Sequence, residues 1–283
     1  MEPKNMNPRA FGILLLARRQ RVVFDHFSTR AHDMNRSPFA SYQPFPCVLA
    51  ILVASSLTAV AAGEPAAKTP SQLQGNSVIT REQQADLTPD AVLQELLEGN
   101  RRFVQDDLTT RNHSARIREA YTGQFPKAVI LSCLDSRIPV EDVFDRGVGD
   151  IFVARVAGNF VNEDILGSME FGCHVAGAKL IMVLGHTHCG AIQAAIDDVQ
   201  LGNITPMLAK IRPALQRPGA FSGEKTAANP EYVAHICRQN IRMAVSEIRR
   251  RSTILKGMEQ DGSLTIVGAY YDLKSGVVSL IDD

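Results

Sequence analysis

The sequence predicts an α/β domain built on a mainly parallel central sheet, with four parallel strands, an antiparallel edge strand and flanking helices. The first observation is that short apolar, β-branched runs alternate with helical segments along the second half of the chain, as in crossover-linked parallel strands. The second is that only a Lys-Ser-Gly turn at 274–276 separates the last two runs, which predicts a hairpin. The hairpin would make one edge of the sheet antiparallel.

The first expected helix spans 88–107. Thr88 can cap it, Pro89 suits its first position and Asp90 favours the helix dipole. One face is apolar at helical spacing: Val92, Leu93, Leu96, Leu97, Phe103 and Val104. This face can pack on its own domain or on a partner subunit, and we expect the N-terminal helix to pack on a partner.

The remaining elements follow the same alternation. The expected strands are 127–133, 150–156, 179–185, 264–272 and 276–283. The expected helices are 166–178, 191–199 and 229–252. Ligand sites of such sheets lie at the carboxyl ends of the strands.

The N-terminal segment does not resemble part of this domain. Residues 47–62 are an uncharged, largely apolar run that ends in Ala59-Val60-Ala61, typical of a secretory signal, and Met34 would start a short basic leader before it. We therefore expect 1–33 to be a non-native extension, 34–62 a signal peptide, 63–86 a flexible linker and 87–283 the folded domain. The protein would be periplasmic or secreted, with no stable membrane span after cleavage. The alternative is an N-terminal membrane anchor, although the run is short for a span of about 20 residues.

Composition excludes some classes of function. Of 283 residues, 30 are basic and 30 acidic, so the formal net charge is zero and no nucleic-acid partner is expected. Signal cleavage would leave four cysteines: Cys133, Cys173, Cys189 and Cys237. An exported protein can form disulfides, so Cys173 and Cys237 are either a pair or small buried hydrophobic residues.

Two polar clusters follow expected strands. "CLDSR" (133–137) ends the first strand and "GHTHC" (185–189) ends the third, so both should lie at one edge of the sheet. His186, Cys189 and Cys133 are suitable zinc ligands, and Asp135 is close enough to be a fourth or to stay free. His188 would then point away. Three firm ligands and one exchangeable position are typical of catalytic zinc.

The paired clusters resemble the Cys-x-Asp-Ser-Arg and His-x-x-Cys motifs of the β-class carbonic anhydrases. "EGNRRF" (98–103), "RVAGN" (155–159) and "GSMEFG" (167–172) add to the resemblance, which covers about residues 88–283. The resemblance implies zinc ligands Cys133, His186 and Cys189, and a dyad of Asp135 with Arg137. It implies reversible hydration of carbon dioxide to bicarbonate, one Zn²⁺ per subunit, and a homodimer or tetramer.

Several details stay open in the sequence. Val140, Phe160 and Val161 are candidate pocket walls, and the Gly190 N–H can bind an anionic oxygen at a helix start. The chain has no Trp, which puts in doubt the inhibitory bicarbonate site of some family members, although Arg155 and Tyr271 could match its other residues. The alternatives are a hydrolase of carbon disulfide or carbonyl sulfide on the same scaffold, a structural zinc in a non-catalytic protein, and a Cys189 nucleophile with His186 as base.

Overall fold

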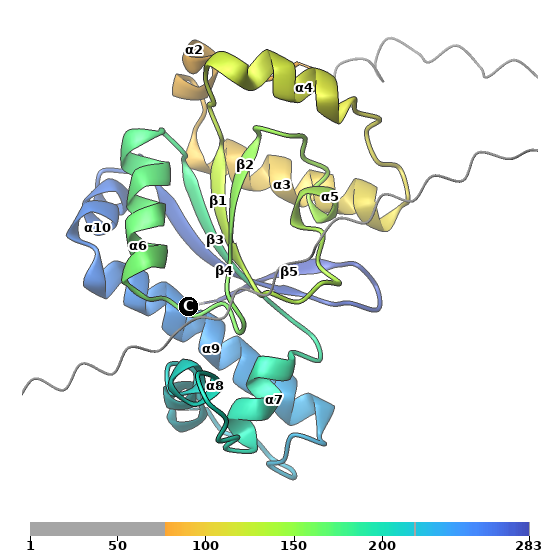
Figure 1. Ribbon diagram of the computed structural model, residues 1–283, viewed down its shortest axis with the longest axis vertical. Coiled ribbons are helices and arrows are strands. Elements are labelled where there is room, and N and C mark those ends of the chain that lie inside the picture. Colours follow the sequence, from red (N-terminus) through yellow and green to blue (C-terminus); the bar gives the residue numbers. More distant parts are fainter. Residues whose placement is uncertain (1–76, 218, 283) are drawn as a thin grey trace, which may run out of the picture. The chain divides into compact units, whose positions relative to one another are not determined.

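The structure is a computed structural model that describes residues 77–217 and 219–282. Its centre is a five-stranded sheet of order β2-β1-β3-β4-β5 (Figure 1). The strands are β1 (Ala128–Ser132), β2 (Ile151–Arg155), β3 (Leu180–His186), β4 (Thr265–Tyr271) and β5 (Val278–Ile281). The first four strands pair in parallel and β5 pairs antiparallel with β4, as predicted.

Helices flank this sheet. The α-helices are α2 (Arg81–Ala85), α3 (Pro89–Val104), α4 (His113–Glu119), α5 (Val140–Val143), α6 (Glu163–Glu170), α7 (Gly190–Ile196), α8 (Ile204–Leu208), α9 (Pro230–Arg251) and α10 (Thr253–Gln260). The described residues also include two 3₁₀ segments, η2 (Ala120–Thr122) and η4 (Arg212–Gln216), and a π turn, η3 (Phe171–Val175). In Figure 1, α2 and α4 lie near the start of β1 and β2, and α7 lies beyond the opposite end of the sheet.

The expected linker contains a helix. Residues 1–76 lie outside the described residues, and with them the expected extension (1–33), the expected signal peptide (34–62) and most of the expected linker (63–86). Helix α2 falls within the described end of that linker, so the prediction of a flexible segment was wrong there. Thr80 and Gln83 form a capping box, and the buried Gln84 side chain donates to the carbonyl oxygens of Pro126 at 2.7 Å and Ala176 at 2.8 Å. Apolar periodicity could not reveal this helix, because polar side chains fix it to the domain.

The helix expected over 166–178 also differs. Asn162 caps α6, which therefore begins at Glu163, and the π turn from Phe171 ends the helix early. The short helices α4, α8 and α10 were not predicted, because segments of five to eight residues carry little periodic signal.

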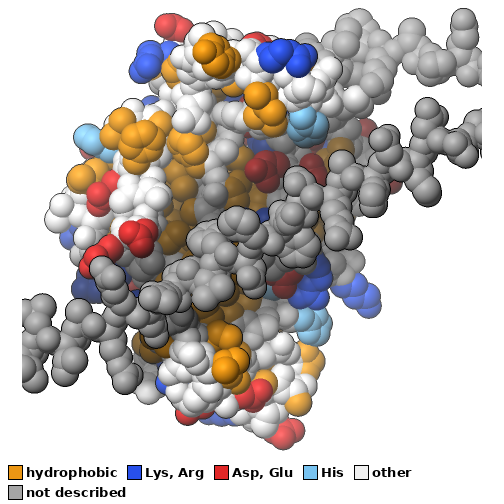
Figure 2. All heavy atoms as spheres, viewed as in Figure 1, with side chains coloured by type: hydrophobic (Ala, Val, Ile, Leu, Met, Phe, Trp, Pro, Cys, Tyr) orange, Lys and Arg blue, Asp and Glu red, His pale blue; other side chains and the backbone are white. Residues whose placement is uncertain are grey.

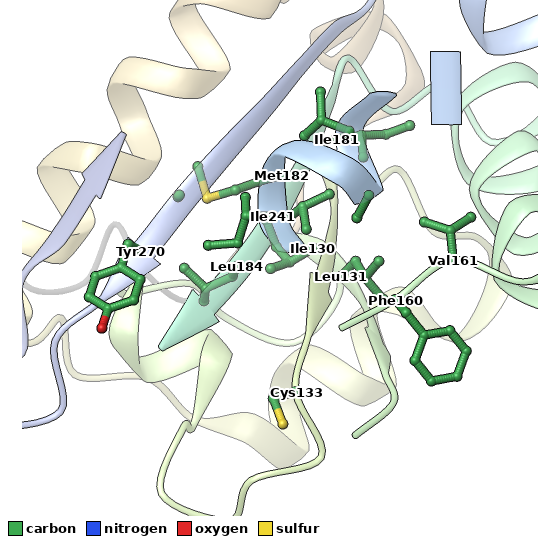
Figure 3. Close-up of a cluster of buried hydrophobic side chains, with 14 of the residues drawn as sticks. Ile130, Leu131, Cys133, Phe160, Val161, Ile181, Met182, Leu184, Ile241 and Tyr270 are labelled. Atoms are coloured by element: carbon green, nitrogen blue, oxygen red, sulfur yellow. The ribbon is translucent and has the colours of Figure 1, made fainter. Parts of the chain in front are cut away.

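The core lies between the sheet and α9 and holds the strand ends in place. Figure 3 shows Ile130 of β1 beside Met182 and Leu184 of β3 in the buried core, and Ile241 of α9 packs on the opposite face of the sheet. A Cβ atom at Gly185 or Gly268 would lie 2.6 Å from the Ile241 side chain, so these glycines let α9 approach the sheet closely. The carboxyl ends of β1 and β3 are thus held on a rigid base.

The N-terminal helix packs on its own domain. α3 buries Val92 and Leu96 in the core, and Asn100 bonds to three backbone groups of the domain. Its contact with a partner subunit stays a prediction. No helix within residues 77–282, Pro218 apart, is long and apolar enough to cross a membrane.

Candidate metal centre

The two sequence motifs meet at the carboxyl edge of the sheet. Cys133 follows β1, His186 is the last residue of β3, and Cys189 is the N-cap of α7. β1 and β3 are direct neighbours, with Ser132 opposite Leu184, so the two strand ends lie side by side. The thiols of Cys133 and Cys189 and a ring nitrogen of His186 lie within 4.8 Å of one another.

The donor atoms suit a zinc ion. All three residues are buried, and the two Sγ atoms are 3.9 Å apart. The His186 Nδ1 atom is 2.8 Å from the carbonyl oxygen of Thr187, to which an Nδ1–H donates. This tautomer turns the Nε2 lone pair toward the thiols, and buried Nε2 has no hydrogen-bond partner among the described residues. Thiolate and imidazole are ligands that zinc prefers, and a buried nitrogen without a hydrogen-bond partner is the feature expected of a metal ligand.

The thiols differ in acidity. The Cys189 thiol donates to Cys133 and lowers the pKa of Cys133 to about 4, against the opposing effect of burial. The Gly158 N–H, 3.3 Å from the Cys133 Sγ atom, lowers the pKa of Cys133 further. The same pairing with Cys133, together with burial, raises the pKa of Cys189. The pairing therefore favours ionisation of Cys133 over Cys189, and zinc binding by both thiolates must release the proton that lies between them.

A carboxylate is clamped beside the cluster. Arg137 donates to Asp135 from Nε to Oδ1 at 2.9 Å, from Nη2 to Oδ2 at 2.7 Å, and from its backbone N–H to Oδ1 at 2.9 Å. These bonds, opposed only partly by burial, lower the pKa of Asp135 to about 2. Asp135 Oδ2 is 4.0 Å from His186 Nε2, and Asp135 is not in the three-residue cluster. The structure therefore places Asp135 next to the three donors, not among them.

Two further contacts support the cluster, and neither was predicted from the sequence. The Asn240 side chain of α9 donates to the Gly158 carbonyl oxygen at 2.8 Å, and the Cys237 thiol donates to the His186 carbonyl oxygen at 3.5 Å. Gly158 lies in "RVAGN", just past the end of β2, and the strand-end rule applied to that motif would have found it. Asn240 comes from a helix far along the chain and only the fold reveals it.

Arg155 holds the loop that carries Asp135. Its Nε donates to the carbonyl oxygen of Cys133 at 3.0 Å, and its Nη2 donates to those of Asp135 at 2.7 Å and Ile138 at 2.8 Å. Arg155, which the sequence offered as a possible residue of the inhibitory bicarbonate site, thus donates these hydrogen bonds to the backbone.

The predicted pocket residues are scattered. Val140 is fully buried at the start of α5. Phe160 and Val161 line a separate cavity of about 280 Å³ with residues of α9, and the Phe160 ring does not point toward Cys133 in Figure 3. Gly190 is exposed at the start of α7, with no atom within 4 Å of where a Cβ would lie. Gly190 alone of these four has open space beside a ligand, and substrate contacts of all four stay predictions.

The remaining cysteines and histidine have ordinary surroundings. Cys173 and Cys237 are free and buried, and burial raises the pKa of each to about 12. The structure therefore does not pair them.

His188 is exposed in the left-handed region (φ +53°), and its carbonyl oxygen accepts from Arg137 Nη2 at 3.4 Å. His188 stays out of the cluster, as expected.

Comparison with known proteins agrees with this geometry. The carbonic anhydrase family model matches residues 128–278. The chain is 34% identical to carbonic anhydrase 2 of Mycobacterium tuberculosis over 200 residues, which cover 69% of this chain and 93% of that protein.

Solved structures share the fold. A Coccomyxa β-carbonic anhydrase aligns with a TM-score of 0.54 at 24% identity, covering 67% of this chain and 86% of its own. A tetrameric β-carbonic anhydrase of Sordaria macrospora aligns with a TM-score of 0.52 at 21% identity, covering 59% of this chain and 86% of its own. The matched family model and the full-length relatives, read with the paired motifs at the sheet edge, show that this chain belongs to the β-class carbonic anhydrase family.

Proposed function

We propose that this enzyme hydrates carbon dioxide reversibly with one zinc ion held by Cys133, His186 and Cys189, and that Asp135 and Arg137 form its catalytic dyad. One observation supports this most: a buried set of two thiols and an orphaned imidazole nitrogen lies beside a carboxylate fixed by three hydrogen bonds. When bound, a zinc ion of this kind lowers the pKa of water to about 7 and so supplies hydroxide at neutral pH.

Asp135 would orient the attacking oxygen. Its pKa of about 2 keeps the carboxylate ionised at neutral pH, so there it can only accept hydrogen bonds. Held by Arg137, Asp135 Oδ2 would accept a hydrogen bond from the hydroxyl of the nucleophile and so direct its lone pair toward the carbon of carbon dioxide. Arg137 is a positioning residue in this scheme, since its donors point at Asp135.

Stopped-flow carbon dioxide hydration by zinc-loaded protein tests the proposal. Asp135→Asn should lower kcat/KM by roughly 10²- to 10⁴-fold, the range for loss of a positioned proton acceptor, while zinc content stays at one per subunit. The matched control is Asp142→Asn, which removes an exposed carboxylate of α5. Turnover of carbonyl sulfide but not carbon dioxide by the wild type would instead support the hydrolase alternative.

We infer that subunits associate through the free edge of the sheet. β2 is one of the two edge strands and only half-buried, and an apolar cavity of about 760 Å³ lies between β2 and α6, with Phe152 and Phe171 in its wall. Figure 2 shows hydrophobic side chains gathered over this region. Light scattering should report a dimer or tetramer, and Phe152→Glu should shift it to monomer. A wild-type monomer would contradict the inference.

We propose export to the periplasm or the medium, guided by the apolar run 47–62 behind Met34. Mass analysis of the mature protein should give an N-terminus just after Ala61 or close to it. An N-terminus before residue 34 would contradict both the export signal and the assigned start.

A further inference from the structure

A second polar cavity lies at the opposite edge of the sheet from the metal centre. Its volume is about 390 Å³. Lys127 directly precedes β1 and Asp150 directly precedes β2, so the cavity lies at the amino ends of these strands. A strand rises about 3.3 Å per residue, so Lys127 is about 20 Å along β1 from Cys133. The cavity is separate from the metal centre.

Cationic side chains dominate its wall. Five of them line it, and they come from α3, α4 and three loops: Arg102, Arg111, Arg116, Lys127 and Arg146. Several of these side chains are nearly buried, with 2% of Arg116, 6% of Arg146 and 12% of Lys127 exposed. Charges at such depth are costly unless they are compensated.

The carboxylates nearby do not balance this charge. Asp145 is shared between Arg102 and Arg111, and Glu95 between Lys127 and Arg146. Asp150 accepts from Arg116 at 2.7 Å. Three carboxylates therefore pair directly with the five cations, and a fourth, Glu119, accepts from the Val78 N–H of the wall at 3.2 Å, so cations remain in excess within the described part of the chain.

Hydrogen-bond donors also exceed acceptors. Buried Arg111 Nε has no acceptor among residues 77–217 and 219–282. Arg102 bonds to Asp145 through Nε, and Lys127 bonds to Glu95 through one of its three N–H groups. Guanidinium and ammonium donors with spare capacity in a cavity are what a phosphate oxygen requires.

We propose that this cavity is a binding site for a small doubly charged oxyanion of the phosphate class. An excess of cations with spare N–H donors matches an anion of this class, and the volume admits a phosphate group. The wall also includes Ser77, Ile79 and Gln83, from α2 and the segment before it. A bound anion would therefore fasten this N-terminal segment to the first two strands and stabilise the domain by mass action.

The test is calorimetric titration of the zinc-loaded protein with inorganic phosphate at constant ionic strength, with chloride as the reference anion. We expect one site per subunit and a rise in thermal midpoint with phosphate beyond that given by chloride. Lys127→Gln and Arg102→Gln should each weaken phosphate binding by roughly tenfold, the usual loss for one charge-assisted bond. The matched control is Arg101→Gln, since Arg101 is adjacent on α3, 60% exposed and paired with Glu98.

Two results would overturn the proposal. One is the absence of saturable phosphate binding at millimolar concentration. The other is binding that survives in both cavity variants or falls as much in Arg101→Gln, which would place phosphate at the metal centre or on the surface. Lys127→Gln is expected to fold, because Arg146 still pairs with Glu95 in that variant, so a loss of phosphate binding there reports on the cavity and not on unfolding.

Discussion

The side-chain amide of Asn240 lies 2.8 Å from the carbonyl oxygen of Gly158, and so joins helix α9 to the peptide that supports Cys133. The N–H of that same Gly158 donates to the Cys133 Sγ atom at 3.3 Å. Gly158 has φ +79°, and a Cβ there would lie 2.4 Å from Ile211 Cδ1, so no other residue fits without strain. Asn240 therefore helps to place a donor that stabilises a thiolate.

Replacing Asn240 should weaken metal binding. Asn240→Ala frees the Gly158 peptide to move away from Cys133, and loss of such an outer partner of a ligand typically lowers metal affinity by about 10- to 100-fold. Competition with a zinc chelator measures the zinc affinity of the variant and of the wild type.

Asn100→Ala is the matched control, because Asn100 is also buried and bonded to backbone but lies on α3. It should destabilise the fold and leave zinc affinity unchanged. Equal loss of affinity in both variants would mean that Asn240 acts only through stability.

The cysteines should separate into ligands and core residues. Cys189→Ser should lose zinc, because a serine hydroxyl does not ionise readily to replace a thiolate. Cys173→Ala should keep one zinc per subunit, since Cys173 is a buried thiol whose pKa is raised to about 12. Metal content by mass spectrometry measures both, and retention of full zinc by Cys189→Ser would contradict the assigned ligand set.

Much of this centre could be predicted from sequence because its residues sit in short motifs at strand ends. Apolar runs of five to seven residues predicted β1 to β4, and parallel pairing then brought Cys133 to His186 and Cys189. The Lys-Ser-Gly turn predicted the antiparallel β5. In each case the local pattern and the global fold agree.

The rest depends on contacts between distant segments. Asn240 reaches Gly158 across 82 positions, and no spacing rule indicates such a bond. The expected linker concealed α2, because Gln84 fixes that helix through the Pro126 and Ala176 carbonyl groups and not through an apolar face. Phe160 was expected in the substrate pocket, yet its side chain lines another cavity.

Acid should destabilise the domain in part through Asp145. Burial opposes its ionisation, but Arg111, Arg102 and Thr109 outweigh burial and lower the pKa of Asp145 to about 2. A carboxyl whose pKa is lower in the folded state stabilises the protein at any pH above its unfolded-state pKa of about 3.9. This stabilisation is lost as the pH falls through the folded-state pKa of about 2.

Asp145→Asn should therefore cost about 2 kcal/mol at pH 7, and the difference from wild type should shrink between pH 4 and pH 2. Denaturant unfolding at several pH values measures it. The exposed Asp142→Asn should stay within about 0.5 kcal/mol of wild type. A difference for Asp145→Asn that does not depend on pH would show that packing and not charge stabilises this site.

Arg155 should control turnover through the position of Asp135. Its guanidinium bonds three carbonyl oxygens of the loop from Cys133 to Ile138, and one ammonium cannot reproduce this planar arrangement. Arg155→Lys keeps the charge but loosens the loop, so kcat should fall by roughly tenfold or more with little change in KM, because a small misplacement of a reacting group is costly. The charge-matched control is Arg118→Lys on the exposed face of α4, which should leave kcat unchanged. Since the ligands themselves remain, zinc content should stay at one per subunit. Unchanged kcat in Arg155→Lys, or a fall explained by zinc loss alone, would mean that the loop keeps Asp135 in place without this clamp.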